Sequence, residues 1–303
     1  MKQNSLKAWI LAVRPYSLGN AVILVLAASA LAWRADGFQP LVAGLCLLFA
    51  LLMQCTANLV NDLYDLLKGA DQPDRLGPDR ALAKGFISMR GMKWGIGAFT
   101  LTSAVVGLAL LSVTLRSGVL RYGGWELVAV GAACILFAYL YTAGPYPLAY
   151  CGLGDVAVIL FFGLVPVGCT YYVQTGGWSW EVTLVALACG LAIDTMLMVN
   201  NFRDSEQDAR VNKKTLVVLL GRGFGRWAYL LLGVGAVACC WALAAGTIRW
   251  AGVATLPYLI LHLLTWRKMV RIDHGDALNE SLGETARNIM LFGALLTIGI
   301  LIG

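Results

Sequence analysis

Long apolar runs separated by short polar segments make up most of the chain. The runs lie at residues 17–33, 41–61, 94–115, 125–143, 153–174, 181–201, 227–246, 250–266 and 287–302. A membrane-spanning helix needs about 20 predominantly apolar residues, because the hydrocarbon core of a bilayer is about 30 Å thick. The pattern therefore predicts an all-α fold, a polytopic membrane bundle of about nine transmembrane helices, in a single domain that spans 1–303.

Composition agrees with a membrane protein. Hydrophobic residues make up 59% of the chain and charged residues 13%, whereas a soluble domain carries about 25% charged residues. The first 20 residues contain basic side chains before an apolar run but no convincing cleavage site, which favours a retained helix over a signal peptide. The 8 cysteines lie mostly within apolar runs and form no CxxC pair, so we interpret them as packing residues.

The basic residues are distributed unevenly between the two sides of the membrane. If the N-terminus is cytoplasmic, the opposite side receives only Arg34, Arg116, Arg121 and Arg249 of the 23 Lys and Arg. Cytoplasmic loops of membrane proteins carry such an excess of basic residues. We therefore expect a multi-pass protein of the cell inner (plasma) membrane, with its N-terminus and polar loops in the cytoplasm. This bias accounts for the net charge of +6, and we predict no nucleic-acid partner.

Polar residues end the second and sixth apolar runs in related motifs, VNDLYD at 60–65 and VNNFRD at 199–204. In the first, Asn58, Asp62 and Asp65 are spaced i, i+4, i+7, which places them on one helical face. A single aspartate at the end of a membrane helix is often only solvated. Two such motifs at equivalent positions indicate instead a weak internal repeat with a polar site between its halves.

The second motif has the same property, because Asn200, Asp204 and Asp208 follow i, i+4, i+8 spacing. Facing carboxylates repel each other unless a cation lies between them, and Mg²⁺ commonly bridges one or two carboxylates to substrate phosphates. We expect the segments 62–93 and 203–226 to be long functional loops. Their basic residues could bind the same phosphates, and these are Arg75, Arg80, Lys84, Arg203, Arg210, Lys213 and Lys214. Together these groups predict a receptor for a diphosphate with a lipid tail.

The same residues carry a family resemblance. NDLYDLLKGAD at 61–71, followed by PDRLGPDRALAKGFIS, resembles the first aspartate-rich region of the UbiA-type membrane prenyltransferases, and NNFRDSEQDARVNKKTL at 200–216 resembles the second. The nine-run layout agrees with that superfamily along the whole chain. These motif forms, together with YTAGPYPLAYCGLGDVAVILFFGLVPVGCTYYVQTG at 141–176, are most similar to the branch that prenylates 1,4-dihydroxy-2-naphthoate in menaquinone synthesis.

The resemblance implies a reaction, a cofactor and a set of site residues. A polyprenyl group would pass from polyprenyl diphosphate to dihydroxynaphthoate with loss of the carboxyl group, giving demethylmenaquinol, diphosphate and CO₂. The cofactor would be Mg²⁺, with the metal ligands Asp62, Asp65, Asp71, Asp204 and Asp208. Asp71 is included because Gly69 stands where the broader family often has a further Asp. The substrate-binding residues would be Asn58, Asn61, Arg75, Arg80, Lys84, Asn200, Asn201, Arg203, Lys213 and Lys214.

Two further aspartates lie inside apolar runs, where ionisable residues are costly and often functional. Asp155 near the start of the fifth run could bind or deprotonate the aromatic substrate, and we include it among the catalytic candidates; a structural hydrogen bond is the alternative. Asp194 could support the second motif or pair with a neighbouring run. Arg14 and Pro15, which begin the first run, also resemble the family, and their local role could be simply to start the helix.

Two alternatives to this function stay open. The first is a prenyltransferase of the same superfamily that uses another aromatic acceptor, such as 4-hydroxybenzoate. The second is a secondary transporter, since paired halves with buried charges are also found in transporters. The carboxylates cluster at one membrane face rather than midway, which favours the enzyme.

Overall fold

The computed structural model describes residues 1–71, 75–120 and 123–303. This part of the chain is helical, and its only strand-like pairing is a single parallel bridge between Cys151 and Lys214. The helices in chain order are α1 (Leu6–Val13), α2 (Pro15–Arg34), α3 (Pro40–Leu67), α4 (Met89–Arg116), α5 (Trp125–Leu140), a 3₁₀ turn η1 (Leu148–Tyr150), α6 (Gly154–Ile159), a π-helical turn η2 (Leu160–Leu164), α7 (Val165–Thr175), α8 (Trp180–Arg210), α9 (Leu216–Ala245), α10 (Trp250–Ala254), α11 (Leu256–Ile272) and α12 (Leu278–Ile302).

The predicted all-α membrane bundle is confirmed. Among the described residues, 7 helical segments are long and apolar enough to cross a membrane, namely α2, α3, α4, the continuous segment Gly154–Thr175, α8, α9 and α12. The run 125–143 forms the shorter apolar helix α5. The run 250–266 is divided near Thr255, because Pro257 fits only the first turn of a new helix, so α10 ends and α11 begins there.

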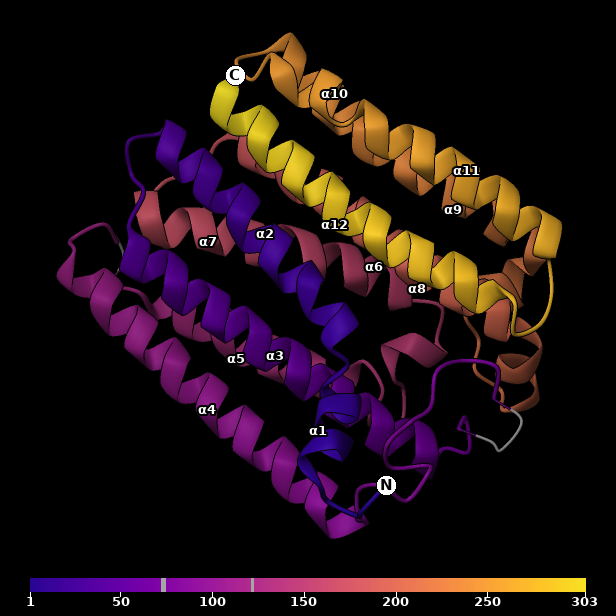
Figure 1. Ribbon diagram of the computed structural model, residues 1–303. Coiled ribbons are helices and arrows are strands. Elements are labelled where there is room, and N and C mark those ends of the chain that lie inside the picture. The colour runs from indigo at the N-terminus through magenta and orange to yellow at the C-terminus, as the bar shows by residue number, and fades with distance from the viewer. Residues whose placement is uncertain (72–74, 121–122) are drawn as a thin grey trace.

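Helix α8 is the centre of the bundle and α4 lies at its edge. The most apolar window of α8 is 72% buried inside the protein, whereas that of α4 is 11% buried. The chain termini lie at opposite ends of the bundle (Figure 1).

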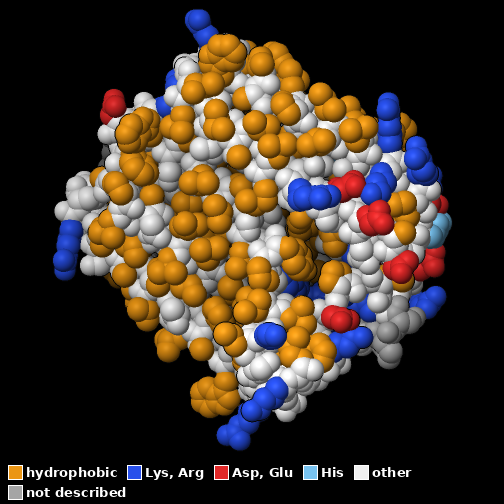
Figure 2. All heavy atoms as spheres, viewed as in Figure 1, with side chains coloured by type: hydrophobic (Ala, Val, Ile, Leu, Met, Phe, Trp, Pro, Cys, Tyr) orange, Lys and Arg blue, Asp and Glu red, His pale blue; other side chains and the backbone are white. Residues whose placement is uncertain are grey.

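The outer surface of the bundle is apolar. Figure 2 shows hydrophobic side chains over most of one face, with Lys, Arg, Asp and Glu gathered towards one side, beside a hollow. Four exposed tryptophans lie at the ends of helices, namely Trp33, Trp125, Trp180 and Trp250. Tryptophan at helix ends is typical of the membrane–water interface.

The two aspartate motifs are the last turns of long helices. Helix α3 continues past its apolar run to Leu67, and α8 continues to Arg210. The first connection is therefore 68–88. The expectation of a long loop over 203–226 was wrong, because α9 begins at Leu216 and only residues 211–215 connect it to α8. The Thr215 side chain caps α9 by accepting a hydrogen bond from the backbone N–H of Val218.

Candidate active site

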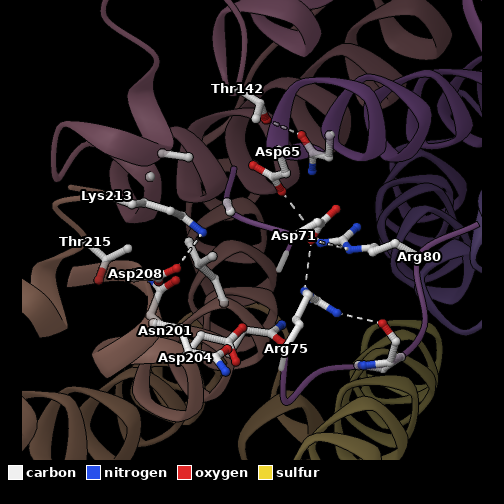
Figure 3. Close-up of a pocket in the computed structure, with 18 of the residues that line it drawn as sticks. Asp65, Asp71, Arg75, Arg80, Thr142, Asn201, Asp204, Asp208, Lys213 and Thr215 are labelled. Carbon is white, nitrogen blue, oxygen red and sulfur yellow. Dashed lines mark hydrogen bonds and ion pairs between the residues drawn. The ribbon is translucent and has the colours of Figure 1, made fainter. Parts of the chain in front are cut away.

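A polar pocket lies where the last turns of α3 and α8 meet the connection 68–88 and the segment 141–155. It contains about 1070 Å³ of empty space, including its open mouth. The predicted site residues that line it are Asn61, Asp65, Asp71, Arg75, Arg80, Asp155, Asn200, Asn201, Asp204, Asp208 and Lys213. The close-up in Figure 3 shows Asp204 and Asp208 on one side, with Asp65, Asp71 and Arg80 on the other.

Helix α3 contributes Asn61 and Asp65 to the pocket. Asp65 Oδ1 accepts a hydrogen bond from the Tyr150 hydroxyl at 2.9 Å, and its Oδ2 lies 3.7 Å from Arg80 Nη2. The Thr142 hydroxyl donates to Asn61 Oδ1. Both α3 side chains are therefore oriented by partners from the segment that follows α5.

Helix α8 contributes a second carboxylate pair. Asp208 lies 3.3 Å from the Lys213 ammonium, and Asp204 receives two hydrogen bonds of 2.7 Å from Arg203. Burial lowers the pKa of Lys213, but Asp208, followed by Asp65 and Asp204, outweighs burial and raises that pKa overall. Carboxylates from both motifs thus act on a single cation at the pocket.

The connection after α3 places an acid and two bases between these helices. Asp71 Oδ1 lies 3.0 Å from Arg75 Nε and 3.7 Å from Arg80 Nε. Burial raises the pKa of Asp71 to about 7, with Asp65 adding to the shift and Arg75 opposing it. Arg75 and Arg80 line the pocket and present guanidinium groups that can hold phosphate oxygens.

Asp62 is not among the residues that line this pocket, although its Oδ2 is buried without a hydrogen-bond partner, so its metal-binding role stays a prediction. Its side chain is 1% exposed, and its Oδ1 accepts hydrogen bonds from Arg14 and, at 2.8 Å, from Arg80. Asp62 therefore holds two cations at the edge of the site. The helical spacing correctly put Asp62 on one face with Asn58, but that face points towards the start of α2.

Four other predicted substrate contacts also lie elsewhere. Asn58 donates to Val13 O and Ser17 Oγ and so ties α3 to the α1–α2 corner. Arg203 is buried, and besides Asp204 it binds Asn279 Oδ1 of α12 at 2.9 Å. Lys84 is exposed and pairs with Asp79, and the exposed Lys214 contributes its backbone to the bridge with Cys151. These four side chains do not line the polar pocket, and their roles as substrate contacts stay predictions.

Arg14 is the main site residue that sequence reasoning missed. It occupies a left-handed backbone conformation, with φ of 52°, between α1 and α2, which turns its side chain back towards Asp62 and the carbonyl of Asn58. Burial lowers the pKa of Arg14, but the surrounding carboxylates, Asp62 first, raise it overall. The available signal was Arg14 directly before the first membrane run, in a dipeptide that resembles the family but to which we assigned no site role.

A larger apolar cavity adjoins the polar pocket inside the bundle. It holds about 2370 Å³ of empty space, including its open mouth, and its walls come from α2 to α8. Leu111, Phe49, Phe161 and Val173 are among the side chains that line it. A charged head group and a long apolar tail could therefore be held in continuous, chemically different spaces.

The pocket suits a hard cation that shares its ligands with a phosphate. Within residues 1–71, 75–120 and 123–303, no three His, Cys, Asp or Glu side chains lie close enough to hold a metal by themselves. Oδ2 of Asp71 and Oδ2 of Asp208 are each buried without a hydrogen-bond partner. Such carboxylate oxygens fit Mg²⁺, which often takes only one or two protein carboxylates and completes its shell with phosphate and water.

Comparison with known proteins places this site in a family. Residues 21–295 match the model of the UbiA prenyltransferase family. A relative from Haemophilus influenzae named 1,4-dihydroxy-2-naphthoate octaprenyltransferase is 35% identical, with 100% of this chain and 98% of the relative covered. A relative of the same name from Escherichia coli is 33% identical, with 97% and 95% covered.

A solved structure has the same fold. It is described as a UbiA homolog from Archaeoglobus fulgidus bound to DMAPP and Mg²⁺, and it superposes with a TM-score of 0.63 at 15% identity, covering 96% of this chain and 99% of that chain. The helical arrangement, the paired aspartate motifs and the match over most of the sequence agree with one another. This chain belongs to the UbiA prenyltransferase family.

Proposed function

We propose that this protein transfers a polyprenyl group from polyprenyl diphosphate to 1,4-dihydroxy-2-naphthoate, with release of diphosphate and CO₂. One observation carries the proposal: carboxylates from α3 and α8 face a pocket that also contains Arg75, Arg80 and Lys213 and that adjoins a large apolar cavity. The names of the full-length relatives support naphthoate as the acceptor.

The donor would lie across both spaces. Its diphosphate fits the polar pocket, where the guanidinium groups of Arg75 and Arg80 and the ammonium of Lys213 offer hydrogen-bond donors. Its prenyl chain fits the apolar cavity, since burying each CH₂ contributes about 0.8 kcal/mol. The reacting carbon, which joins chain and diphosphate, would then lie where the two spaces meet.

Asp65, Asp71, Asp204 and Asp208 are the residues that would hold Mg²⁺ beside the diphosphate. When bound, Mg²⁺ would offset the negative charge that grows on the departing diphosphate. The basic side chains act on the same charge, so they favour breaking of the bond between the allylic carbon and oxygen. The ring carbon of the acceptor then bonds to the allylic carbon, and the electron pair of the ring–carboxyl bond returns to the ring as CO₂ leaves.

The charge distribution supports a definite orientation. The polar pocket is lined by the last turns of α3 and α8, which lie at the end of the bundle that holds the N-terminus (Figure 1). We place this end in the cytoplasm and the protein in the inner (plasma) membrane, following the bias of Lys and Arg. Both proposed water-soluble reaction components, the acceptor and diphosphate, would then exchange with the cytoplasm.

The test is product analysis with purified protein in lipid nanodiscs. Incubation with Mg²⁺, a defined prenyl diphosphate and dihydroxynaphthoate should yield the decarboxylated prenyl naphthoquinol by mass spectrometry, with equal amounts of CO₂ and diphosphate. 4-Hydroxybenzoate should compete poorly. Preferred prenylation of 4-hydroxybenzoate would move the protein to another acceptor class. Uptake of either substrate into sealed vesicles without release of diphosphate would instead support the alternative of a secondary transporter.

A further inference from the structure

The junction between the polar pocket and the apolar cavity is defined by side chains that line both. These are Arg14, Tyr16, Asn61, Tyr141, Leu197 and Asn200. With a diphosphate in one space and a prenyl chain in the other, the reacting carbon of the donor lies at this junction. An aromatic acceptor must reach the same place, because the new carbon–carbon bond forms there.

Asp155 presents an unused hydrogen-bond acceptor beside this junction. It lines the polar pocket, while Ala157 and Val158 of the same helix line the apolar cavity. The residue is 6% exposed, and its Oδ1 is buried without a hydrogen-bond partner. An unsatisfied buried carboxylate oxygen is costly, so Asp155 is suited to receive a donor from a ligand.

Tyr141 provides a second polar group at the same place. It lines both spaces, and its hydroxyl lies close to the backbone of Gly154, where a Cβ would be 3.5 Å from Tyr141 Oη. The hydroxyl therefore approaches the residue directly before Asp155. A phenol hydroxyl can donate as well as accept, so it complements a carboxylate that only accepts.

We propose that Asp155 and Tyr141 form the acceptor subsite and bind a ring hydroxyl of the dihydroxyarene. This inference rests on the proposed function and adds the group that the acceptor must carry. A hydroxyl suits Asp155 better than the acceptor's carboxylate does, because two carboxylates would repel each other. The carboxylate has a cationic neighbour in Arg14, the basic residue common to the linings of both spaces among the described residues.

The subsite has a direct role in the reaction. As the ring carbon bonds to the allylic carbon and the bond to diphosphate breaks, positive charge grows on the ring and the hydroxyl becomes more acidic. Its proton shifts towards Asp155. Loss of CO₂ then returns an electron pair to the ring, and the proton returns to the ring oxygen, so no net proton is gained or lost. A hydrogen bond that strengthens along this path stabilises the transition state more than the bound substrate.

Asp194 supplies a comparison for removing a buried acid that lies near Asp155 but outside both linings. Its Oδ1 is also buried without a partner, and the residue is 1% exposed, but it lines neither space. Asp155→Asn, Tyr141→Phe and Asp194→Asn should be compared with the wild type after confirming folding by size-exclusion chromatography. The assays are initial rates with varied donor or acceptor, and equilibrium binding of dihydroxynaphthoate in the absence of donor.

Asp155→Asn should lower kcat/KM for the acceptor by about 10- to 100-fold, the range expected for a hydrogen bond to a charged group. The KM for the donor should change less than about twofold. Tyr141→Phe should show a smaller loss of the same kind, and Asp194→Asn should keep the wild-type acceptor KM. The subsite would be overturned if Asp155→Asn bound the acceptor as the wild type does. It would also be overturned if kcat/KM fell equally for the donor and for the acceptor.

A substrate analogue separates binding of the hydroxyl from general damage. The wild type should discriminate strongly against mono-O-methyl ethers of dihydroxynaphthoate, because a methylated oxygen cannot donate to Asp155. Asp155→Ala should lose most of that discrimination for one of the two ethers. Retained discrimination against both would also overturn the inference. A wild type that prenylates a different hydroxyarene would overturn only the proposed acceptor, and the same variants assayed with that arene would still decide the role of Asp155.

Discussion

Asp71 is a site residue whose charge should respond to pH near neutrality. Burial raises its pKa to about 7, with Asp65 adding to the shift. Below that pH the carboxyl is mostly protonated, and Mg²⁺ must displace the proton to use it as a ligand. Raising the pH from 6 to 8 should therefore strengthen Mg²⁺ binding, by at most about tenfold per pH unit. Mg²⁺ titrations of activity at several pH values measure this effect.

Asp71→Asn is the control for this prediction. The amide does not titrate, so the variant should bind Mg²⁺ more weakly and with a flatter dependence on pH. The same steep dependence in the variant and the wild type would assign the proton to another group.

Arg14 should contribute to stability as well as to the site. Its guanidinium binds Asp62 and the carbonyl of Asn58, and Asp62 is almost fully buried. Arg14→Ala would leave Asp62 with Arg80 as its remaining partner, at a cost of about 1–3 kcal/mol. We expect a lower unfolding temperature and a higher acceptor KM for Arg14→Ala, because the acceptor's carboxylate would lose its cationic neighbour. Arg14→Lys, which keeps the charge, should lose less. A variant Arg14→Ala that unfolds like the wild type would show that Arg80 alone satisfies Asp62.

Single residues also show how far sequence reasoning reached. The motif spacing correctly brought Asp65, Asp204 and Asp208 to one pocket. Spacing alone does not show which neighbouring helix each side of a helix contacts. We therefore predicted that Arg203 binds phosphate, whereas in the structure it binds Asp204 and Asn279. Contacts between residues far apart in the chain, such as Arg14 with Asp62, leave no local pattern to read.

At the scale of elements, the lengths of the apolar runs predicted which segments are helical but not where each helix ends. The run 181–201 is part of a helix that extends to Arg210, because the last turns leave the membrane and no longer need apolar side chains. Hydropathy therefore locates the membrane part and misreads polar helical turns as loops. The break at Thr255 was missed for a related reason, since Pro257 interrupts a helix without changing hydropathy.

The segment after α5 links the two halves through Tyr150 at the end of η1. Its hydroxyl donates to Asp65, and its ring lies 4.8 Å from Lys68 Nζ and 5.6 Å from Lys213 Nζ. Its carbonyl accepts a hydrogen bond of 3.2 Å from the backbone N–H of Lys214. Tyr150 therefore positions a carboxylate from one motif and a cation beside the other.

Tyr150→Phe should lower kcat by about 10- to 100-fold, because a hydrogen bond to a charged group of about 1.5–3 kcal/mol is lost while the ring remains. Tyr150→Leu should lose more, since the ring contacts with both lysines are also removed. Tyr146→Phe is the control in the same segment, because Tyr146 is 82% exposed and should tolerate the change. Equal activity of Tyr150→Phe and Tyr146→Phe in steady-state assays would argue against a positioning role.

At the scale of the whole molecule, the bundle separates two chemistries along the membrane normal. Charged side chains gather towards one side of the molecule (Figure 2) and line the polar pocket, whereas the apolar cavity lies among helices α2 to α8. This separation explains why long apolar runs end in carboxylates. The same helix lines the space for a lipid tail and, one or two turns later, the space for its charged head.

The repeated motifs make the two halves of the molecule act on one group. Asp65 and Asp204 end VNDLYD and VNNFRD, and both line the polar pocket. If each holds the same Mg²⁺–diphosphate unit, replacing either with Ala weakens an interaction that grows as diphosphate leaves. Each single variant should lose roughly 10²-fold or more in kcat, on the scale of removing one group that stabilises developing charge. The measurement is steady-state kinetics on folded protein at saturating Mg²⁺ and donor.

The double variant decides whether the halves are coupled. Groups that act as a unit give strongly non-additive losses, so Asp65→Ala with Asp204→Ala should be little worse than the worse single variant. Independent carboxylates would instead give losses that multiply, to roughly 10⁴-fold. Lys84→Ala is the control for removing a charged side chain near the site. Lys84 is exposed and lies outside the pocket lining, so this variant should retain wild-type kcat. Near wild-type turnover in both single aspartate variants would mean that these carboxylates are only solvated helix ends.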